Sequence, residues 1–160
     1  MLKETRRDFL SKHAHKYGIV RHKIFIFKVK FKNQTVPTMA TVMIVDDAAF
    51  MRAVLKKIVL QCGHEVVAEA VNGDEAIEKY QQCKPDIVLL DIVMPAGSKA
   101  KDGIEALKKI VAMDPSAKVI MCSSMGQQAL VAEALKSGAK DFIVKPFQPQ
   151  KVMEVLNKWG

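Results

Sequence analysis

Five short apolar runs alternate with longer segments of helical spacing along residues 40–160. The runs are rich in β-branched residues and are unbroken apart from Glu69, which is typical of strands buried on both faces of a sheet. They cover residues 42–45, 66–71, 87–90, 119–122 and 142–144. The segments after each run place apolar residues three and four apart, which predicts amphipathic helices. These predicted helices cover residues 49–61, 74–83, 103–112, 127–137 and 149–159.

This alternation predicts an α/β fold, a doubly wound five-stranded parallel sheet with five helices covering both faces. In such a sheet, ligands bind beyond the carboxyl ends of the strands. Asp46 and Asp47 close the first run, Asp91 the third, Ser123 the fourth and Lys145 the fifth. We expect these five side chains to converge at one edge. The second run ends in no comparable residue, as expected for a strand at the edge of the sheet.

Charge divides the chain into two parts. The whole chain has a net charge of +8, and residues 1–39 contain ten Lys or Arg and two Asp or Glu, whereas residues 40–160 contain fifteen of each. This asymmetry predicts a basic N-terminal extension over 1–39 and a neutral globular domain over 40–160. We expect no nucleic-acid binding by the domain, and we expect the extension to be disordered or not native. Met39 precedes Ala40-Thr41-Val42 as the first residue of a free-standing domain would, which indicates that translation starts there.

The extension also allows other interpretations. Phe25, Phe27 and Phe31 alternate with Lys28 and Lys30, so a strand here would have one apolar and one basic face. Such a strand could join a sheet edge, lie on an anionic membrane or contact nucleic-acid phosphates. A nucleic-acid-binding or membrane-binding protein acting through this arm is therefore an alternative function.

Cysteine content and apolar run lengths exclude several protein classes. The three cysteines are an odd number without C-x-x-C spacing, which excludes a disulfide scaffold and a zinc site and favours the reducing cytoplasm. The longest apolar runs span only a few residues, too few for a transmembrane helix or a secretory signal. We therefore expect a cytoplasmic protein without membrane insertion.

Three carboxylates at one sheet edge repel one another unless a cation joins them. All-oxygen ligands without His or Cys favour a hard ion, and Mg²⁺ is the natural choice. Mg²⁺ takes one or two carboxylates, so the remaining aspartate is free to attack phosphorus and form an acyl phosphate. Lys145 would balance the charge of the transferred group, and the Ser123 hydroxyl could sense the new phosphoryl oxygens.

The combination of these residues resembles the receiver domain of two-component response regulators. The motifs that carry the resemblance are Asp46-Asp47, Asp91 with Met94-Pro95, Asp102-Gly103, Ser123 and Lys145-Pro146. The resemblance runs from about Val42 to Lys158, and within the family the chain is most similar to single-domain chemotaxis receivers of the CheY type. It implies the strand order 2-1-3-4-5.

The resemblance also implies roles for individual residues. Asp91 would be the phosphoacceptor, and Mg²⁺ would be bound by Asp46, Asp47, Asp91 and the backbone carbonyl of Val93. Ser123 and Lys145 would sense the phosphoryl group. Phe142 would be an aromatic switch, and the bond before Pro146 would be cis. Asp102 has a simpler interpretation as the N-cap of the third predicted helix.

The implied function is a phosphorylation-activated signalling switch. A histidine kinase, of the chemotaxis type, would phosphorylate Asp91, and a phosphatase is a possible further partner. The output surface would consist of the fourth helix, the fifth strand and the fifth helix, and its target would be the flagellar motor switch. The protein would be a monomer and no enzyme beyond catalysing its own phosphorylation and dephosphorylation. A phosphorelay intermediate is the alternative within signalling.

The sequence departs from the common receiver pattern at three places. Six residues, 96–101, separate Pro95 from Asp102 where two are usual, and they place Lys99 and Lys101 near the predicted site. Val93 and Met125 are apolar at two positions that influence acyl phosphate hydrolysis in relatives, which predicts a long-lived phosphorylated state. Phe142 lacks the hydroxyl of the tyrosine common in relatives, so its inward state would depend on packing alone.

Overall fold

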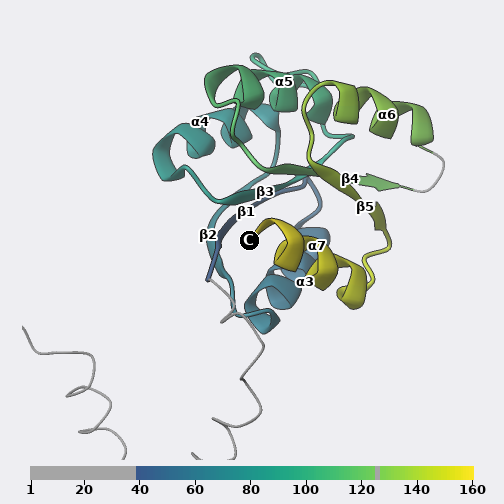
Figure 1. Cartoon of the computed structure of the whole chain (residues 1–160). Helices are drawn as coiled ribbons and strands as arrows, with labels where there is room; N and C mark the ends of the chain where they lie inside the picture. The colour runs from purple at the N-terminus through teal and green to yellow at the C-terminus, as the bar shows by residue number, and fades with distance from the viewer. Residues whose placement is uncertain (1–38, 125–126) are drawn as a thin grey trace, which may run out of the picture. The chain divides into compact units, whose positions relative to one another are not determined.

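Five parallel strands form one sheet in the order β2-β1-β3-β4-β5, which confirms the expected topology (Figure 1). The computed structural model describes residues 39–124 and 127–160, so the expectations for the extension over 1–38 and for Met125 lie outside the described residues. The strands are β1 (Thr41–Val45), β2 (Glu65–Ala70), β3 (Ile87–Asp91), β4 (Val119–Ser124) and β5 (Asp141–Lys145). Each lies within two residues of its predicted position.

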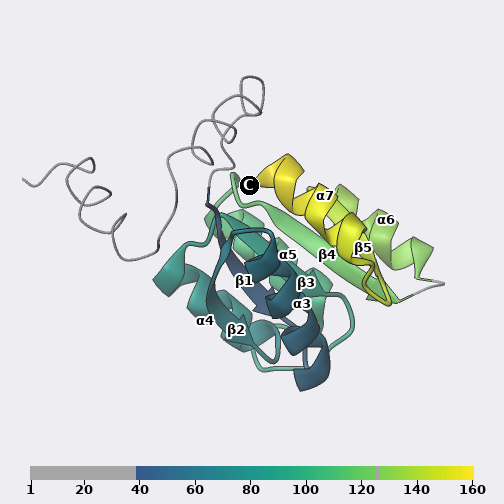
Figure 2. The same cartoon turned by 90° about the horizontal axis from the view of Figure 1, so that it is seen from below.

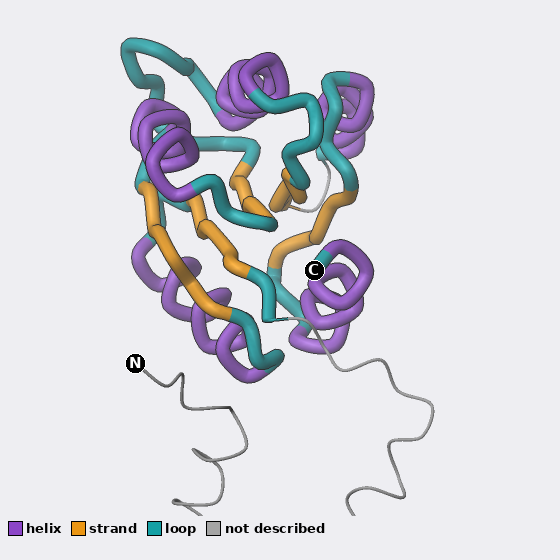
Figure 3. The backbone as a smooth tube through the Cα atoms, turned by 60° about the vertical axis from the view of Figure 1, so that its left-hand side comes forward, coloured by secondary structure: helices purple, strands orange, loops and turns teal. Residues whose placement is uncertain are grey.

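Five helices cover the two faces of this sheet. They are α3 (Ala49–Gln61), α4 (Gly73–Cys83), α5 (Gly103–Met113), α6 (Gln128–Lys136) and α7 (Pro149–Trp159). α4, α5 and α6 pack on one face, and α3 and α7 pack side by side on the other, as the views from two directions show (Figures 1 and 2). The strands therefore form the middle of three layers (Figure 3).

The central strands are buried on both faces because their apolar runs are unbroken. Along β1, Met43 and Val45 belong to the hydrophobic cluster under α4, α5 and α6, whereas Val42 and Ile44 belong to the cluster under α3 and α7. All five residues of β3 are buried. This alternation follows from the two-residue period of a strand. The edge strands β2 and β5 are only partly buried.

Side chains near the start of two helices fix where these helices begin. The Asn72 side chain accepts a hydrogen bond from the Glu75 N–H at 2.9 Å, and that of Asp102 accepts one from the Glu105 N–H at 2.8 Å. Both are N-caps, which confirms the simpler interpretation of Asp102. Ala48, which precedes α3, provides no such cap. The turn between β1 and α3 therefore depends on other contacts.

Among the helices of the described residues, none combines the length and the hydrophobicity that a membrane crossing requires.

Candidate functional site

Three aspartates from two strand ends form a carboxylate cluster. Asp46 and Asp47 follow the last residue of β1, and Asp91 is the last residue of β3. One carboxylate oxygen of each lies within 4.8 Å of the others. Asp46 and Asp91 are buried, with 1% and 6% of their surface exposed, whereas Asp47 is exposed. Neighbouring parallel strands bring these residues together, as the sequence predicts.

Lys145, the last residue of β5, reaches the same cluster from the far side of β4. Its Nζ donates hydrogen bonds to Asp46 Oδ2 and to Asp91 Oδ2, both at 2.7 Å. Its peptide bond to Pro146 is cis. The side chain is 15% exposed, so the two ion pairs are screened only weakly by solvent.

The shifted pKa values of Asp91 and Lys145 indicate that Lys145 alone does not neutralise the cluster. Burial raises the pKa of Asp91, the nearby charge of Asp46 raises it further, and the bonds from Lys145 oppose this shift only in part. Burial lowers the pKa of Lys145, but its bonds to Asp46 and Asp91 outweigh burial and leave that pKa raised. The cluster therefore contains one ammonium group and three carboxylates.

This arrangement fits a hard divalent cation. The donors are carboxylate oxygens, two of the three carboxylates are buried, and a cation would relieve the desolvation that raises the pKa of Asp91. Asp47 is exposed. The N–H of Val93 donates to Asp91 Oδ1 at 3.4 Å, and its side chain is 54% exposed. The Val93 carbonyl as a further ligand stays a prediction.

Ser123 and Phe142 both line a groove beside β4 and β5. Ser123 is 1% exposed in β4, and it pairs in register with Val144 of β5. The groove has a volume of about 350 Å³. Its lining residues come from β4, β5, α6 and the segment before α6, and they are Ser123, Ser124, Gln127, Gln128, Val131, Ala132, Leu135, Phe142 and Val144. Phe142 is 38% exposed, so its ring is not in an inward position.

The sequence and the fold place this chain among known proteins. Residues 42–157 match the response regulator receiver domain. The chain belongs to this family. The chemotaxis protein CheY of Thermotoga maritima is 62% identical over 117 residues, which are 73% of this chain and 94% of the relative. CheY of Listeria monocytogenes is 61% identical over 120 residues, which are 75% of this chain and 98% of the relative.

Solved receiver structures agree with this assignment. The crystal structure of a CheX–CheY–BeF₃–Mg²⁺ complex from Borrelia burgdorferi aligns with a TM-score of 0.69 and 40% identity. The alignment covers 74% of this chain and 87% of the matched chain. The chain is therefore a receiver domain in both sequence and fold.

The longer loop of this receiver domain, residues 96–101, is bound to α4. The Asp74 carboxylate accepts the backbone N–H groups of Ser98, Lys99 and Ala100 at 2.7 to 2.8 Å. The Lys99 ammonium pairs with Glu78 of α4. Lys99 therefore shares its charge with a carboxylate of α4, and its effect on the phosphorylation site stays a prediction.

The sequence alone does not single out two residues that shape this receiver domain, Arg52 and Asp74. Arg52 of α3 donates to the backbone carbonyls of Asp46 and Asp47. Asp74 holds the longer loop. Both occupy ordinary polar positions near helix starts, and the sequence carries no signal that distinguishes them from solvent-facing charges.

Proposed function

We propose that this receiver domain is a phosphorylation-activated chemotaxis response regulator with Asp91 as the phosphoacceptor. The observation that carries the proposal is the position of Asp91, buried at the end of β3 with Lys145 Nζ at 2.7 Å and two more carboxylates within 4.8 Å. Relatives above 60% identity are chemotaxis CheY proteins, and they are matched over nearly their whole length.

The chemistry is a phosphoryl transfer onto a carboxylate. An Asp91 oxygen attacks the phosphorus of a phosphohistidine, the P–N bond breaks with its electron pair left on the imidazole nitrogen, and an acyl phosphate forms. Lys145 stabilises the charge of the transferred group because its ammonium already contacts the attacking carboxylate. Asp46, Asp47, Asp91 and the Val93 carbonyl would hold Mg²⁺, which when bound neutralises phosphoryl oxygens.

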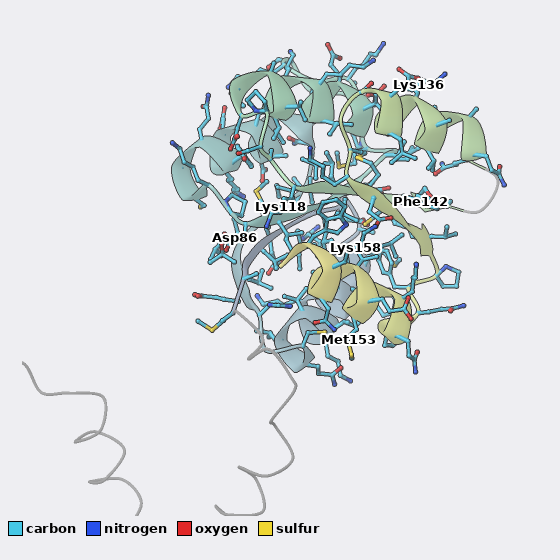
Figure 4. All side chains as sticks on the ribbon, viewed as in Figure 1. Asp86, Lys118, Lys136, Phe142, Met153 and Lys158 are labelled. Atoms are coloured by element: carbon cyan, nitrogen blue, oxygen red, sulfur yellow. The ribbon has the colours of Figure 1, made fainter. Side chains whose placement is uncertain are left out.

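The groove beside Phe142 supports the proposed output surface. Figure 4 labels Phe142 on β5, Lys136 on α6 and Met153 on α7, which mark the three elements of this face. Phe142, Val144 and Met153 are large apolar side chains with 38 to 40% of their surface exposed. In this proposal the face binds the flagellar motor switch, Ser123 reports the phosphoryl group, and the upstream partner is a chemotaxis histidine kinase.

The proposed location is the cytoplasm. The CheX–CheY complex of the Borrelia relative supports a CheX-like protein as a further partner. Cys62, Cys83 and Cys122 are unpaired, which agrees with a reducing compartment.

Incubation with acetyl phosphate and Mg²⁺, followed by intact mass analysis, tests the phosphoacceptor. The wild type gains one phosphoryl adduct, and Asp91→Asn gains none. Asp102→Asn is the matched control because this aspartate caps α5 and lies outside the cluster, and it is expected to gain the adduct. A wild type without an adduct, or an adduct that persists in Asp91→Asn, contradicts the assignment.

Binding to purified motor switch protein tests the output. Phosphorylated protein is expected to bind more tightly than unphosphorylated protein, and Phe142→Ala to weaken that binding. Phe50→Ala is the control, since Phe50 is 75% exposed on α3, which lines no part of the groove beside Phe142. Equal binding by both forms of the wild type contradicts the chemotaxis output while leaving phosphorylation intact.

A further inference from the structure

A single guanidinium holds the backbone between β1 and α3. Arg52 Nη1 donates to the carbonyl oxygen of Asp46 at 2.8 Å and to that of Asp47 at 3.3 Å. The Arg52 side chain is 16% exposed, so this cation lies mostly under neighbouring residues. The two carbonyls belong to the aspartates whose side chains enter the carboxylate cluster.

Backbone hydrogen bonds also reach this turn, since the Asp46 N–H donates to the Ala70 carbonyl at 3.1 Å. The Ala48 N–H donates to Asp46 Oδ1 at 2.9 Å, and Ala48 provides no side-chain cap for α3. Arg52 does not cap the helix, because a guanidinium only donates. Instead it links the first turns of α3 to the carbonyls of the two residues that follow β1. A planar guanidinium, always charged, suits this task because its donors are rigidly spaced.

Arg52 also forms an ion pair with the edge strand β2, although its buried Nε donates no hydrogen bond. Arg52 Nε lies 3.4 Å from Glu69 Oε2, while Glu69 Oε1 accepts from Lys56 Nζ at 2.7 Å. Lys79 of α4 donates to the Glu69 carbonyl at 2.6 Å. The hydrogen bond from Lys56 is the largest cause that lowers the pKa of Glu69, and the charge of Arg52 lowers it further. The Glu69 carboxylate therefore stays ionised and keeps its ion pair with Arg52.

We infer that Arg52 is a positioning residue for the metal site: it fixes the backbone of Asp46 and Asp47 so that their carboxylates meet that of Asp91. Arg52 touches only the carbonyls of these residues and not their carboxylates, so it acts through the backbone rather than as a ligand or a counter-charge. The inference rests on the proposed function in one respect, that this cluster binds Mg²⁺.

Calorimetric titration with Mg²⁺ tests the inference on wild type, Arg52→Gln, Arg52→Lys and Lys56→Gln. Lys56→Gln is the matched control because Lys56 pairs with the same Glu69 but does not contact the turn. Loss of a residue that orients metal ligands costs about tenfold or more in metal affinity. We expect a loss of this size in Arg52→Gln. We expect a smaller loss in Arg52→Lys, because its ammonium group is still a donor but lacks the planar geometry of the guanidinium. Lys56→Gln is expected to bind Mg²⁺ with wild-type affinity.

A kinetic measurement separates positioning from stability. At low Mg²⁺ the rate of phosphoryl gain from acetyl phosphate is expected to fall in Arg52→Gln, and saturating Mg²⁺ is expected to restore it. Circular dichroism at the same temperature confirms that the variant is folded. A residue that only stabilises the fold would leave the Mg²⁺ affinity of the folded protein unchanged.

Each outcome decides between the alternatives. Wild-type Mg²⁺ affinity in folded Arg52→Gln overturns the inference. Wild-type Mg²⁺ affinity in Arg52→Lys also overturns it, and this second variant decides the test if Arg52→Gln fails to fold. Weakening by Lys56→Gln as strong as that by Arg52→Gln also overturns it, because the effect would then come from the Glu69 network. A wild type that binds no Mg²⁺ contradicts the proposed function itself.

Discussion

Asp74 Oδ2 accepts two hydrogen bonds from Ser98, one from its N–H at 2.7 Å and one from its hydroxyl at 2.8 Å. The other carboxylate oxygen accepts the N–H groups of Lys99 and Ala100, each at 2.8 Å. A side chain at Gly97 would overlap with this carboxylate. The loop that distinguishes this receiver domain is thus held by one aspartate at the start of α4.

Asp74→Asn is expected to release this loop. An amide keeps the shape of the carboxylate but accepts at one oxygen only, so at least one N–H of residues 98–100 loses its partner. Hydrogen exchange of these N–H groups is expected to become about tenfold faster. Glu78→Gln is the control, because it removes only the exposed pair with Lys99. Unchanged exchange in Asp74→Asn contradicts this account of the loop.

The same carboxylate makes stability depend on acidic pH. Burial opposes ionisation of Asp74, but the bonds from Ser98, Ala100 and Lys99 outweigh it and lower its pKa to about 2. Since the folded pKa lies below the unfolded value of about 3.9, this stabilisation is complete above pH ~4 and is lost as the pH falls towards 2. The difference in unfolding free energy between wild type and Asp74→Asn should shrink over this interval. A difference that is independent of pH would rule out this linkage.

Asp91→Asn is expected to stabilise the protein at neutral pH in the absence of Mg²⁺. Burial raises the pKa of Asp91 above its unfolded value, so stability falls as the pH rises between the two values and stays lower above them. Removing this ionisation should raise Tm by a few degrees at pH 7 in EDTA. Added Mg²⁺ should then raise the Tm of the wild type and have little effect on Asp91→Asn. A lower Tm in Asp91→Asn would show that its ion pair with Lys145 outweighs the burial of its charge.

Val93→Asn is expected to shorten the lifetime of the acyl phosphate severalfold. The apolar Val93 side chain is 54% exposed two residues after Asp91, and it offers an incoming water no hydrogen bond. An amide at this position could orient such a water towards phosphorus. Loss of the phosphoryl adduct with time, followed by mass analysis, measures the rate, with Val93→Leu as the apolar control. A wild type that dephosphorylates faster than Val93→Asn would disprove the prediction.

Gly103→Ala is expected to disturb the end of β3. The Gly103 N–H donates to the Ile92 carbonyl at 2.9 Å, and a Cβ at this glycine would overlap with the carbonyl oxygen of Asp91. Backbone atoms can shift little to relieve this overlap. The substitution should therefore lower the free energy of unfolding by about 3 kcal/mol and weaken phosphorylation in the protein that remains folded. Chemical unfolding and acetyl phosphate labelling measure the two effects. An alanine variant with wild-type stability would show that the backbone at Asp91 can shift without cost.

Much of this receiver domain is readable from local pattern. Unbroken β-branched runs predict the central strands β1, β3 and β4, since such residues are stable only where both faces are covered. Parallel topology then predicts that Asp46, Asp91 and Lys145 meet, because carboxyl ends of parallel strands share one edge. The structure places Asp46, Asp47, Asp91 and Lys145 together at this edge, as the sequence predicts.

Other features depend on segments that are far apart in the chain. Whether Lys99 faces the phosphorylation site or α4 depends on Asp74 and Glu78, more than twenty residues earlier. The position of Phe142 beside an open groove likewise depends on how α6 packs over β4 and β5. The periodicity of the sequence does not predict these contacts, because each depends on which side chains the packing of distant segments brings together.

The sequence by itself determined the order of the elements, the sheet and the convergence of an acidic cluster with one lysine, because these follow from residue periodicity and from the rules of parallel connection. Only the tertiary structure decided that Arg52 holds the two carbonyls beneath that cluster and that Asp74 holds the longer loop. Hydrogen bonds of this kind need particular atoms at about 3 Å in a set direction, and such geometry is settled when the packed layers come together.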